Sequence, residues 1–359
     1  MRLSLLQLGK GTVGRALIGQ VREQRAALAG RLGVELVYAG IAGRRSGAFE
    51  PDGIDLDRWE KRVEGGGTDG RTILKQALGV LSGPAVLVDA TAEEGMTAPY
   101  LEALSAGLHV VSCNKKPLAG SLEEYRAVKE AARRNRRFWL YEVSVGAGLP
   151  VLGTLRGLLD SGDRLESIEG CFSGTLNYLC AGLDAGEKFS EVLARASELG
   201  YTEPDPRDDL GGTDVARKGL ILAREAGRDL EAKDVRLEPF CAVDRRGDAS
   251  RFIAKSTGLD AELARRWKAA ASRGARLRYV ATIDGGCAAS LREVPADSAL
   301  GRLSGPENIF VFRTGRYAQN PLVVSGPGAG PQVTAAGAFA DVITVARSIV
   351  GMAGGGCGG

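Results

Sequence analysis

A glycine pattern close to the start of the chain limits its fold more than any other feature. Gly9-Lys10-Gly11-Thr12-Val13-Gly14 follows an apolar run at 3–8, which predicts a buried strand, and opens a helical pattern at 13–28. In such a strand–turn–helix unit, the first glycine permits a tight turn. The second lets the backbone approach a pyrophosphate, and the third lets the helix pack close to the strand. The pattern therefore predicts a dinucleotide site that includes Gly9, Gly11, Thr12, Val13 and Gly14.

Strand-like and helix-like segments alternate over the first part of the chain, which indicates a parallel sheet covered by helices. Further strands are predicted at 34–42, 85–89, 109–112 and 138–142, helices at 71–80, 97–106 and 121–134, and a loop at 52–70. The pattern then changes, with helices predicted at 149–159, 176–183, 190–199 and 214–226 and strands at 165–172, 308–313 and 322–325. Segments 277–283 and 287–294 resemble an antiparallel pair, and a long helix is predicted at 333–350.

These patterns predict an α/β protein with two domains. We expect a Rossmann-type dinucleotide-binding domain at 1–143, completed by 322–351. An α+β catalytic and dimerisation domain is expected at 144–321, followed by a glycine-rich, flexible tail at 352–359 that contains Cys357.

Composition excludes several classes of partner. The 47 Lys and Arg residues nearly balance the 44 Asp and Glu residues, for a net charge of +3, so we expect no nucleic-acid partner. No leader segment and no apolar stretch long enough to cross a bilayer is apparent, so we expect no membrane partner. The six cysteines are scattered. This pattern is typical of reduced thiols in a cytoplasmic protein and argues against a zinc site.

The end of the second predicted strand bears on the choice of cofactor. A carboxylate there would bind the ribose 2′-hydroxyl of NAD, but the sequence has no acid at this point and instead has Arg44 and Arg45. Guanidinium groups match a 2′-phosphate, so the sequence favours NADP over NAD. The alternative, that both arginines are solvated loop charges, stays open.

Hydride transfer to or from a carbinol needs a group that exchanges the hydroxyl proton. The only histidine, His109, begins a predicted strand and is expected to be structural. Lysines therefore become the candidates, either in Asn114-Lys115-Lys116-Pro117 at the end of a strand or in the segment 200–218. Asp214 and Lys218 in that segment are four residues apart and share a helix face, although a surface ion pair would have the same spacing.

Over nearly its full length, the chain resembles the homoserine dehydrogenases. The resemblance rests on the glycine turn, on 114–117, on Tyr141-Glu142-Val143-Ser144-Val145-Gly146-Ala147-Gly148-Leu149-Pro150 and on 172–178. It continues through 200–218, the most specific block, and through 326–330 and 334–337. It implies NAD(P)-dependent interconversion of L-homoserine and L-aspartate 4-semialdehyde in threonine, methionine and isoleucine biosynthesis, by a homodimer. It resembles the form without an aspartate kinase or ACT domain, so feedback through an appended domain is not expected.

The resemblance also implies roles for individual residues. Lys218 matches the catalytic proton donor and acceptor, and Lys115 matches a lysine near the nicotinamide that assists at the substrate hydroxyl. Substrate-binding residues are implied at Glu203, Asp208 and Asp214, and further cofactor contacts at Thr91, Gly200 and Gly330. A monovalent cation site, usually sodium, is implied at Glu142, Val145, Ala147 and Leu149, although a simple glycine turn would have the same sequence.

Two alternatives remain at this point. Aspartate-semialdehyde dehydrogenase would need a nucleophilic cysteine and a histidine base, and here Cys113 and His109 lie on the same predicted strand. An NAD(P)-sensing protein would keep the fold and bind the cofactor without turnover.

Overall fold

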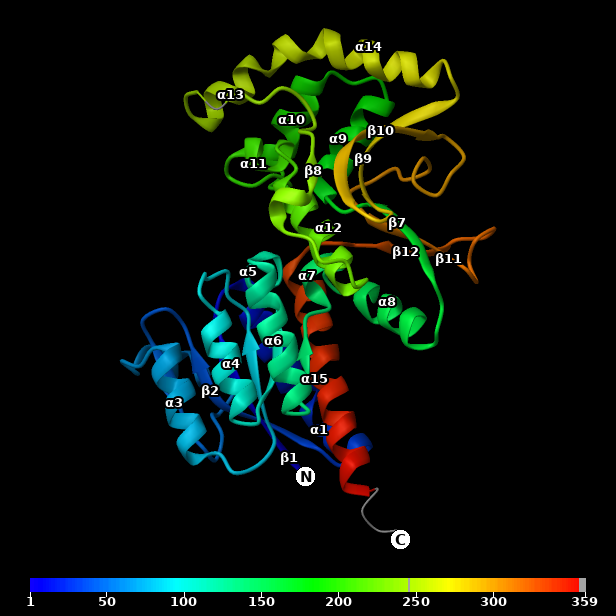
Figure 1. Cartoon of the computed structure of the whole chain (residues 1–359). Coiled ribbons are helices and arrows are strands. Elements are labelled where there is room, and N and C mark those ends of the chain that lie inside the picture. Colours follow the sequence, from blue (N-terminus) through cyan, green and yellow to red (C-terminus); the bar gives the residue numbers. More distant parts are fainter. Residues whose placement is uncertain (245, 355–359) are drawn as a thin grey trace. The chain divides into compact units, whose positions relative to one another are not determined.

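The computed structural model describes residues 1–244 and 246–354, which form two compact units. The first contains Met1–Gly148 and the chain from Gly330 onward, and the second contains Leu149–Ala329 (Figure 1). Two expected boundaries therefore move. Segment 144–148 stays with the first unit because its short helix contacts the last helix, and strand 322–326 joins the second unit because it pairs there. Of the expected tail, 352–354 belong to the last helix, whereas Cys357 lies outside the described residues.

A mostly parallel sheet forms the centre of the first unit. Its strand order is β3-β2-β1-β4-β5-β6, and β3 runs antiparallel to β2 at one edge. The strands are β1 (Arg2–Leu8), β2 (Glu35–Ala42), β3 (Gly47–Phe49), β4 (Ala85–Asp89), β5 (His109–Ser112) and β6 (Trp139–Leu140). The chain order reverses between β1 and β4, and the carboxyl ends of strands at such a reversal are where α/β sheets bind ligands.

Helices cover both faces of this sheet. They are α1 (Thr12–Leu32), α2 (Trp59–Glu64), α3 (Gly70–Val80), α4 (Thr97–Ser105), α5 (Lys116–Ala119), α6 (Leu122–Arg134), α7 (Val143–Gly146) and α15 (Pro331–Gly354). The segment 52–70 is therefore not simply a loop, because α2 buries Trp59 and Val63. The strand expected at 138–142 is reduced to β6, and Glu142 instead precedes α7.

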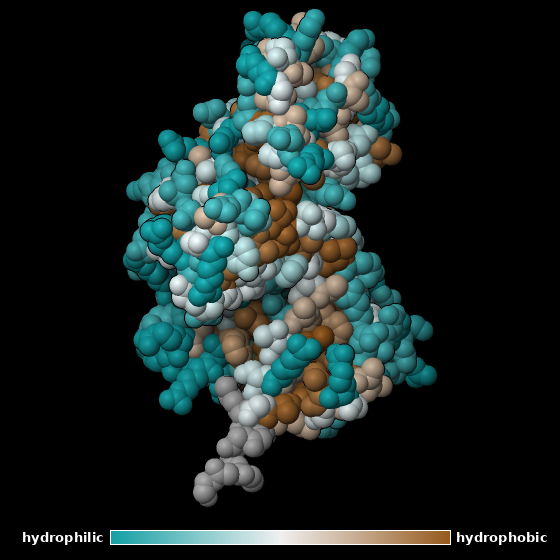
Figure 2. Space-filling view, turned by 90° about the vertical axis from the view of Figure 1, so that its right-hand side faces the viewer, coloured by the Kyte–Doolittle hydropathy of each residue, from teal (hydrophilic) through white to brown (hydrophobic). Residues whose placement is uncertain are grey.

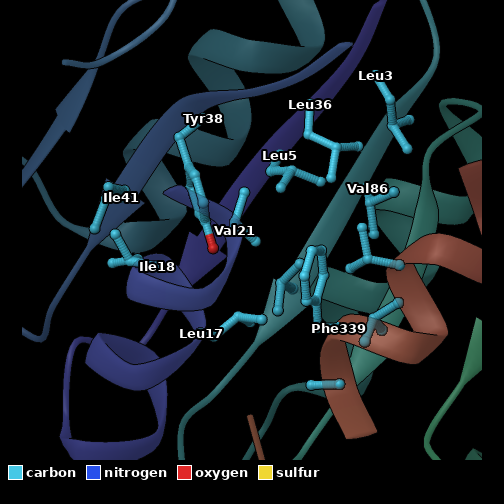
Figure 3. Packing of buried hydrophobic residues seen from close by; sticks show 14 of the residues in the cluster. Leu3, Leu5, Leu17, Ile18, Val21, Leu36, Tyr38, Ile41, Val86 and Phe339 are labelled. Carbon is cyan, nitrogen blue, oxygen red and sulfur yellow. The ribbon is translucent and has the colours of Figure 1, made fainter. Parts of the chain in front are cut away.

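One core cluster of the first unit lies between its sheet and the helices α1 and α15. Leu17 and Val21 of α1 face Leu5 of β1, and Phe339 of α15 reaches the same cluster (Figure 3). All of these side chains are at least nine-tenths buried. Their removal from water, at about 25 cal/mol per Å² of apolar surface, is the main contribution that holds the last helix to the first one.

The long helix α15 contradicts the expectation that no apolar stretch could span a bilayer. Among the described residues, it is the one helix long and apolar enough to do so by length and composition. About half of that stretch is buried inside the protein, and Ala335, Val342 and Val345 lie in the core beside α1. Its apolar character is thus accounted for by packing within the first unit.

The second unit is built on a six-stranded sheet of order β12-β11-β7-β9-β10-β8. Its strands are β7 (Leu165–Cys171), β8 (Arg236–Leu237), β9 (Ala275–Ile283), β10 (Cys287–Pro295), β11 (Asn308–Thr314) and β12 (Leu322–Gly326). All neighbours pair antiparallel except β8 and β10, which are parallel. The expected pair at 277–283 and 287–294 is confirmed as β9 and β10, with Ile283 opposite Cys287.

Helices α9, α12 and α14 contact this second sheet, and α10 packs on α9. The helices of this unit are α8 (Val151–Asp160), α9 (Gly174–Asp184), α10 (Phe189–Glu198), α11 (Pro206–Leu210), α12 (Thr213–Glu225), α13 (Ala249–Lys255) and α14 (Asp260–Ala271). Two 3-10 turns, Ala232–Asp234 and Ser256–Leu259, lie between them. The sequence analysis anticipates none of α11, α13 and α14.

Candidate active site

A cavity of about 1020 Å³ opens in the first unit at the carboxyl ends of β1, β2 and β4. Four of the expected cofactor residues line it, namely Gly9, Gly11, Arg44 and Thr91. Thr12 and Val13 follow in the first turn of α1. No side chain caps the N-terminus of this helix, and its first turn has no acidic residue. Helix N-terminal N–H groups and the helix dipole attract anions, so this end of α1 suits a pyrophosphate.

The three glycines of the turn have three different surroundings. A Cβ on Gly9, where φ is +99°, would lie 2.4 Å from the Ala90 carbonyl oxygen, and one on Gly14 would lie 2.1 Å from the Gly9 carbonyl oxygen. These two glycines are needed for the chain to pack against itself. A Cβ on Gly11 would meet no protein atom within 4 Å, so the space beside it is open for a ligand. The residues of the turn therefore fit a dinucleotide.

The two arginines after β2 differ in their position. Arg44 lines the cavity, and its side chain, 82% exposed, lies 3.5 Å from a Glu93 carboxylate oxygen. Arg45 is also exposed but is not among the residues that line the cavity. Arg71, at the start of α3, lines the cavity as well and has no counterpart in the sequence predictions.

A buried hydrogen-bond network lies under the loops that follow β4 and β5. The Asp89 carboxylate, 0% exposed, accepts bonds from the Thr91 backbone N–H and hydroxyl, from the Tyr100 hydroxyl and from the Asn114 side-chain amide. The Tyr100 hydroxyl also lies 2.8 Å from the Ser112 hydroxyl. One carboxylate thus joins the Thr91 loop, which lines the cavity, to the loop that precedes Lys115.

Lys115 is half-buried and stands directly before α5. Its carbonyl accepts the Ala119 N–H at 3.0 Å, while the neighbouring Asn114 amide oxygen accepts the Lys116 N–H at 3.0 Å. These backbone contacts hold the base of the Lys115 side chain at the carboxyl end of β5. The side chain of Lys116 lines the cavity and pairs with Glu94 at 3.2 Å.

In the second unit, Lys218 is the central charged group. It lies on α12, is 7% exposed, and its Nζ is 2.9 Å from an Asp214 carboxylate oxygen. The same Nζ donates a hydrogen bond of 2.7 Å to the Phe172 carbonyl. The i, i+4 pair is therefore not a plain surface ion pair. Its lysine is buried and held by a charge and by a backbone oxygen.

The acidic loop beside α12 differs from the prediction in one residue. Asp208 is exposed, whereas Asp209 is half-buried and accepts the Glu203 N–H at 2.8 Å. Burial raises the pKa of Asp209 to about 6, and the nearby charges of Glu203 and Asp214 act in the same direction, against hydrogen bonds that lower it. Asp209 is the carboxylate that the sequence analysis missed. Its spacing in the sequence does not distinguish it from Asp208.

Glycines fix the two ends of this acidic segment. Gly200, with φ of +71°, ends α10 in the left-handed conformation. Gly212, with φ of +72°, begins α12, and a Cβ there would lie 1.9 Å from the Tyr279 hydroxyl oxygen. The start of the helix that carries Lys218 can therefore approach β9 only with glycine at 212.

The expected cation residues lie around α7. Val145 and Ala147 are buried, and Ala147 adopts φ of +51° and ψ of −116°, a conformation that is rare for alanine. The Glu142 N–H donates to Asp341 of α15 at 3.0 Å. Leu149 begins the second unit, and its carbonyl accepts the Val151 N–H. The described residues contain no cluster of three or more His, Cys, Asp or Glu side chains fit for a metal, so backbone oxygens would have to form this site.

The surroundings of Cys113 and His109 do not suit the nucleophile and the base that an aspartate-semialdehyde dehydrogenase would need. Burial, together with the charges of Asp89 and Asp341, raises the pKa of the Cys113 thiol, which disfavours the thiolate that a nucleophile needs. Burial, with the nearby Arg137, lowers the pKa of His109 to about 4. Its Nδ1 accepts the Phe138 N–H and its ring stacks on Phe138, as in a structural histidine.

Gly330, another expected cofactor residue, precedes α15 with φ of +110°. Its carbonyl accepts bonds from the N–H and the hydroxyl of Thr334, and a Cβ at this glycine would meet nothing within 4 Å. It therefore starts the last helix without packing against other parts of the first unit.

Comparison with known proteins is consistent with this geometry. The model of the homoserine dehydrogenase family matches residues 150–343, and that of the homoserine dehydrogenase NAD binding domain matches residues 9–142. A bifunctional aspartokinase/homoserine dehydrogenase 1 from Zea mays, described as chloroplastic, is 40% identical over 347 residues. That alignment covers 94% of this chain and 37% of the relative. The chain spans about two fifths of the length of the curated relatives it matches.

Solved structures are similar over nearly the whole chain. A putative homoserine dehydrogenase from Archaeoglobus fulgidus has a TM-score of 0.78 at 26% identity, covering 96% of this chain and 99% of its own. A hyperthermophilic archaeal homoserine dehydrogenase mutant, solved in complex with NADPH, has a TM-score of 0.74 at 25% identity. The match covers 96% of this chain and 97% of that structure's chain. The NAD binding model covers the glycine turn, and the second model covers the buried Lys218. The chain therefore belongs to the homoserine dehydrogenase family.

Proposed function

We propose that this chain catalyses the NADP(H)-dependent interconversion of L-homoserine and L-aspartate 4-semialdehyde. The observation that carries the proposal is Lys218, a buried amine on α12 held by Asp214 and by the Phe172 carbonyl beside an acidic loop. It is a proton-exchanging group of the kind that carbinol oxidation requires, in a chain with a dinucleotide-type turn.

Lys218 serves as the proton donor when the semialdehyde is reduced. The Asp214 carboxylate and the Phe172 carbonyl stabilise its ammonium form, which can give a proton to the carbonyl oxygen as that oxygen becomes a hydroxyl. When bound, the nicotinamide supplies or accepts the hydride at the same substrate carbon. In oxidation the order is reversed, and the hydroxyl proton passes to the neutral amine. Lys115 would add positive charge near the alkoxide oxygen.

The acidic loop binds the substrate ammonium group. Glu203, Asp209 and Asp214 offer three carboxylates, of which Asp209 is joined to Glu203 through its backbone N–H. Charge-assisted hydrogen bonds from an ammonium to such carboxylates are stronger than neutral ones. Asp208, which the resemblance implied as a substrate ligand, is exposed and is better suited to a supporting role.

The cofactor is held at the first unit, with NADP(H) preferred over NAD(H). The cavity residues Gly9, Gly11 and Arg44 would bind the phosphates, and Thr91 the ribose at the nicotinamide end. NADPH complexes among the similar structures support the use of this cofactor by the family. Gly200 and Gly330 are proposed as further backbone contacts, and Arg45 as a more distant positive charge.

The proposal is tested by steady-state oxidation of L-homoserine with each cofactor. Lys218→Met keeps the aliphatic stem of the side chain and should lower kcat by at least about 100-fold, the lower part of the range for acid–base groups. Lys188→Met is the matched control, since that lysine forms an exposed i, i+3 pair with Glu191 in the same unit. Full kcat in Lys218→Met would refute the assigned role, and wild-type cofactor binding without turnover would favour a sensor instead.

A cation site and a dimer complete the proposal. The backbone oxygens around Val145 and Ala147, in a buried turn with an unusual backbone conformation, would hold sodium.

The chain would act as a cytoplasmic homodimer in amino-acid biosynthesis. Apolar surface on the second unit supports an interface (Figure 2). The two edge strands of its sheet carry the exposed side chains Val323 and Leu237. Light scattering in solution tests the dimer, and the sodium dependence of activity at constant ionic strength tests the cation.

A further inference from the structure

Lys10, the second residue of the glycine turn, has a place in the structure that the glycine motif does not explain. The motif leaves this position unspecified. In this chain the lysine is half-buried and lines the cavity. Its stem lies across the backbone of Gly43. A Cβ at residue 43 would be 2.8 Å from Lys10 Cε and 3.2 Å from both Cδ and Cγ.

Gly43 is the first residue after β2, and this is the point that decides which cofactor is bound. In dinucleotide folds, the group that follows the second strand meets the ribose 2′ position, with an acid for a hydroxyl and a cation for a phosphate. Gly43 separates Ala42 from Arg44, and both neighbours line the cavity. A lysine whose stem crosses Gly43 therefore carries its charge to the same end of the cavity as Arg44.

The local charges distinguish the two cations. Arg44 is exposed and already faces Glu93 at 3.5 Å, an arrangement that contributes little in water. No carboxylate in the described ranges 1–244 and 246–354 forms an ion pair with Lys10. A half-buried, unbalanced ammonium attracts an anion more strongly than an exposed, paired one, because the solvent screens it less.

We propose that Lys10 is a specificity-determining residue that binds the 2′-phosphate of NADP(H) together with Arg44, with Gly43 as the platform for its side chain. This inference rests on the proposed dinucleotide site and deepens it. A phosphate monoester carries close to two negative charges, so it can use a second cation even while Glu93 competes for Arg44. Lysine binds phosphate as a compact charge and needs no bidentate geometry.

The test uses cofactor fragments, so it does not depend on turnover. Calorimetry would compare adenosine 2′,5′-bisphosphate with adenosine 5′-monophosphate on the full chain. Lys10→Met should weaken the bisphosphate at least about tenfold, a loss of about 1.4 kcal/mol, and the monophosphate less than threefold. Gly43→Ala, which adds no charge but removes the space for the stem, should change affinities in the same direction. Lys75→Met is the matched control, since this exposed lysine of α3 lies outside the cavity lining and should leave both affinities unchanged.

Four results would overturn the inference. An equal loss for both fragments in Lys10→Met would assign the lysine to the 5′-phosphate side, and no loss for either would leave it without a binding role. Failure of the wild type to bind the bisphosphate would also overturn it. The proposed function fails separately. If bisphosphate binding depends on Lys10 but the chain does not oxidise homoserine, the inference stands and the proposed function fails. If Lys10→Met oxidises homoserine with the same NADP-to-NAD ratio of kcat/KM as the wild type, the inference fails and the proposed function stands.

Discussion

The substitution Gly11→Ala should separate cofactor affinity from folding stability. Residue 11 has φ of −70° and ψ of −166°, which alanine adopts without strain, and an added Cβ would touch no protein atom within 4 Å. The remaining cost comes from the poorer helix N-cap. We expect the free energy of unfolding to fall by only about 0.5 kcal/mol.

The effect on the cofactor should be much larger. The methyl group would enter the space that a pyrophosphate needs to reach the N–H groups of α1, which no side chain caps. Loss of one charge-assisted hydrogen bond costs about 1.5–3 kcal/mol, so the Kd for NADPH should rise about 10- to 150-fold. The change in binding free energy would thus exceed the change in stability several times.

Urea unfolding and NADPH fluorescence titration measure the two quantities. Gly19→Ala is the matched control, because residue 19 lies inside α1 with open space around it. That variant should gain about 0.5–1 kcal/mol of stability and keep its Kd. Gly14→Ala, whose Cβ would overlap the Gly9 carbonyl, should instead lose stability. The reasoning is refuted if Gly11→Ala binds NADPH as tightly as the wild type, or if it loses more than about 2 kcal/mol of stability.

Two further predictions concern the acidic loop and the buried network. The pKa of Asp209 is raised to about 6, so its carboxylate is protonated below that pH and cannot hold an ammonium as an anion. The kcat/KM for homoserine should therefore fall as the pH drops through about 6. The pH profile of Asp209→Asn should lack this acidic limb. An acidic limb that is unchanged in the variant would contradict the role of Asp209 in binding the substrate ammonium. Tyr100→Phe removes a hydrogen bond to the Asp89 carboxylate and one to Ser112. Urea unfolding should show a free energy of unfolding lowered by about 2–4 kcal/mol, whereas the control Tyr317→Phe, at an exposed site, should leave it unchanged. Equal stabilities of the two variants would argue against the network.

Much of the first unit is predictable because its signals are local. Buried parallel strands produce continuous apolar runs, as in β1 and β4, and the glycine turn marks the strand–helix junction between β1 and α1. The edge strand β3 has three residues and exists only through its pairing with β2, so no run of its own sequence identifies it. Helix α14 does carry a signal, since Leu263, Trp267 and Ala270 recur at helical spacing, but the sequence analysis did not use it.

The candidate site shows the same limit at the level of single residues. The spacing of Asp214 and Lys218 predicts only that they share a helix face, and their roles come from the family resemblance. Asp208 and Asp209 are adjacent on a short helix, so they point about 100° apart, and only the tertiary structure decides which one faces Glu203. Lys10 is similar, because its relation to Gly43 depends on how β1 and β2 lie side by side.

The position of α15 has a consequence for biosynthesis of the protein. A ribosome makes all six strands of the first sheet by residue 140, yet the partner that covers α1 emerges only after the whole second unit has been made. Until then the side of α1 that contacts α15 lacks its cover. Cotranslational folding should therefore complete the later-made unit first, and nascent chains arrested before residue 331 should remain protease-sensitive in their earliest-made part.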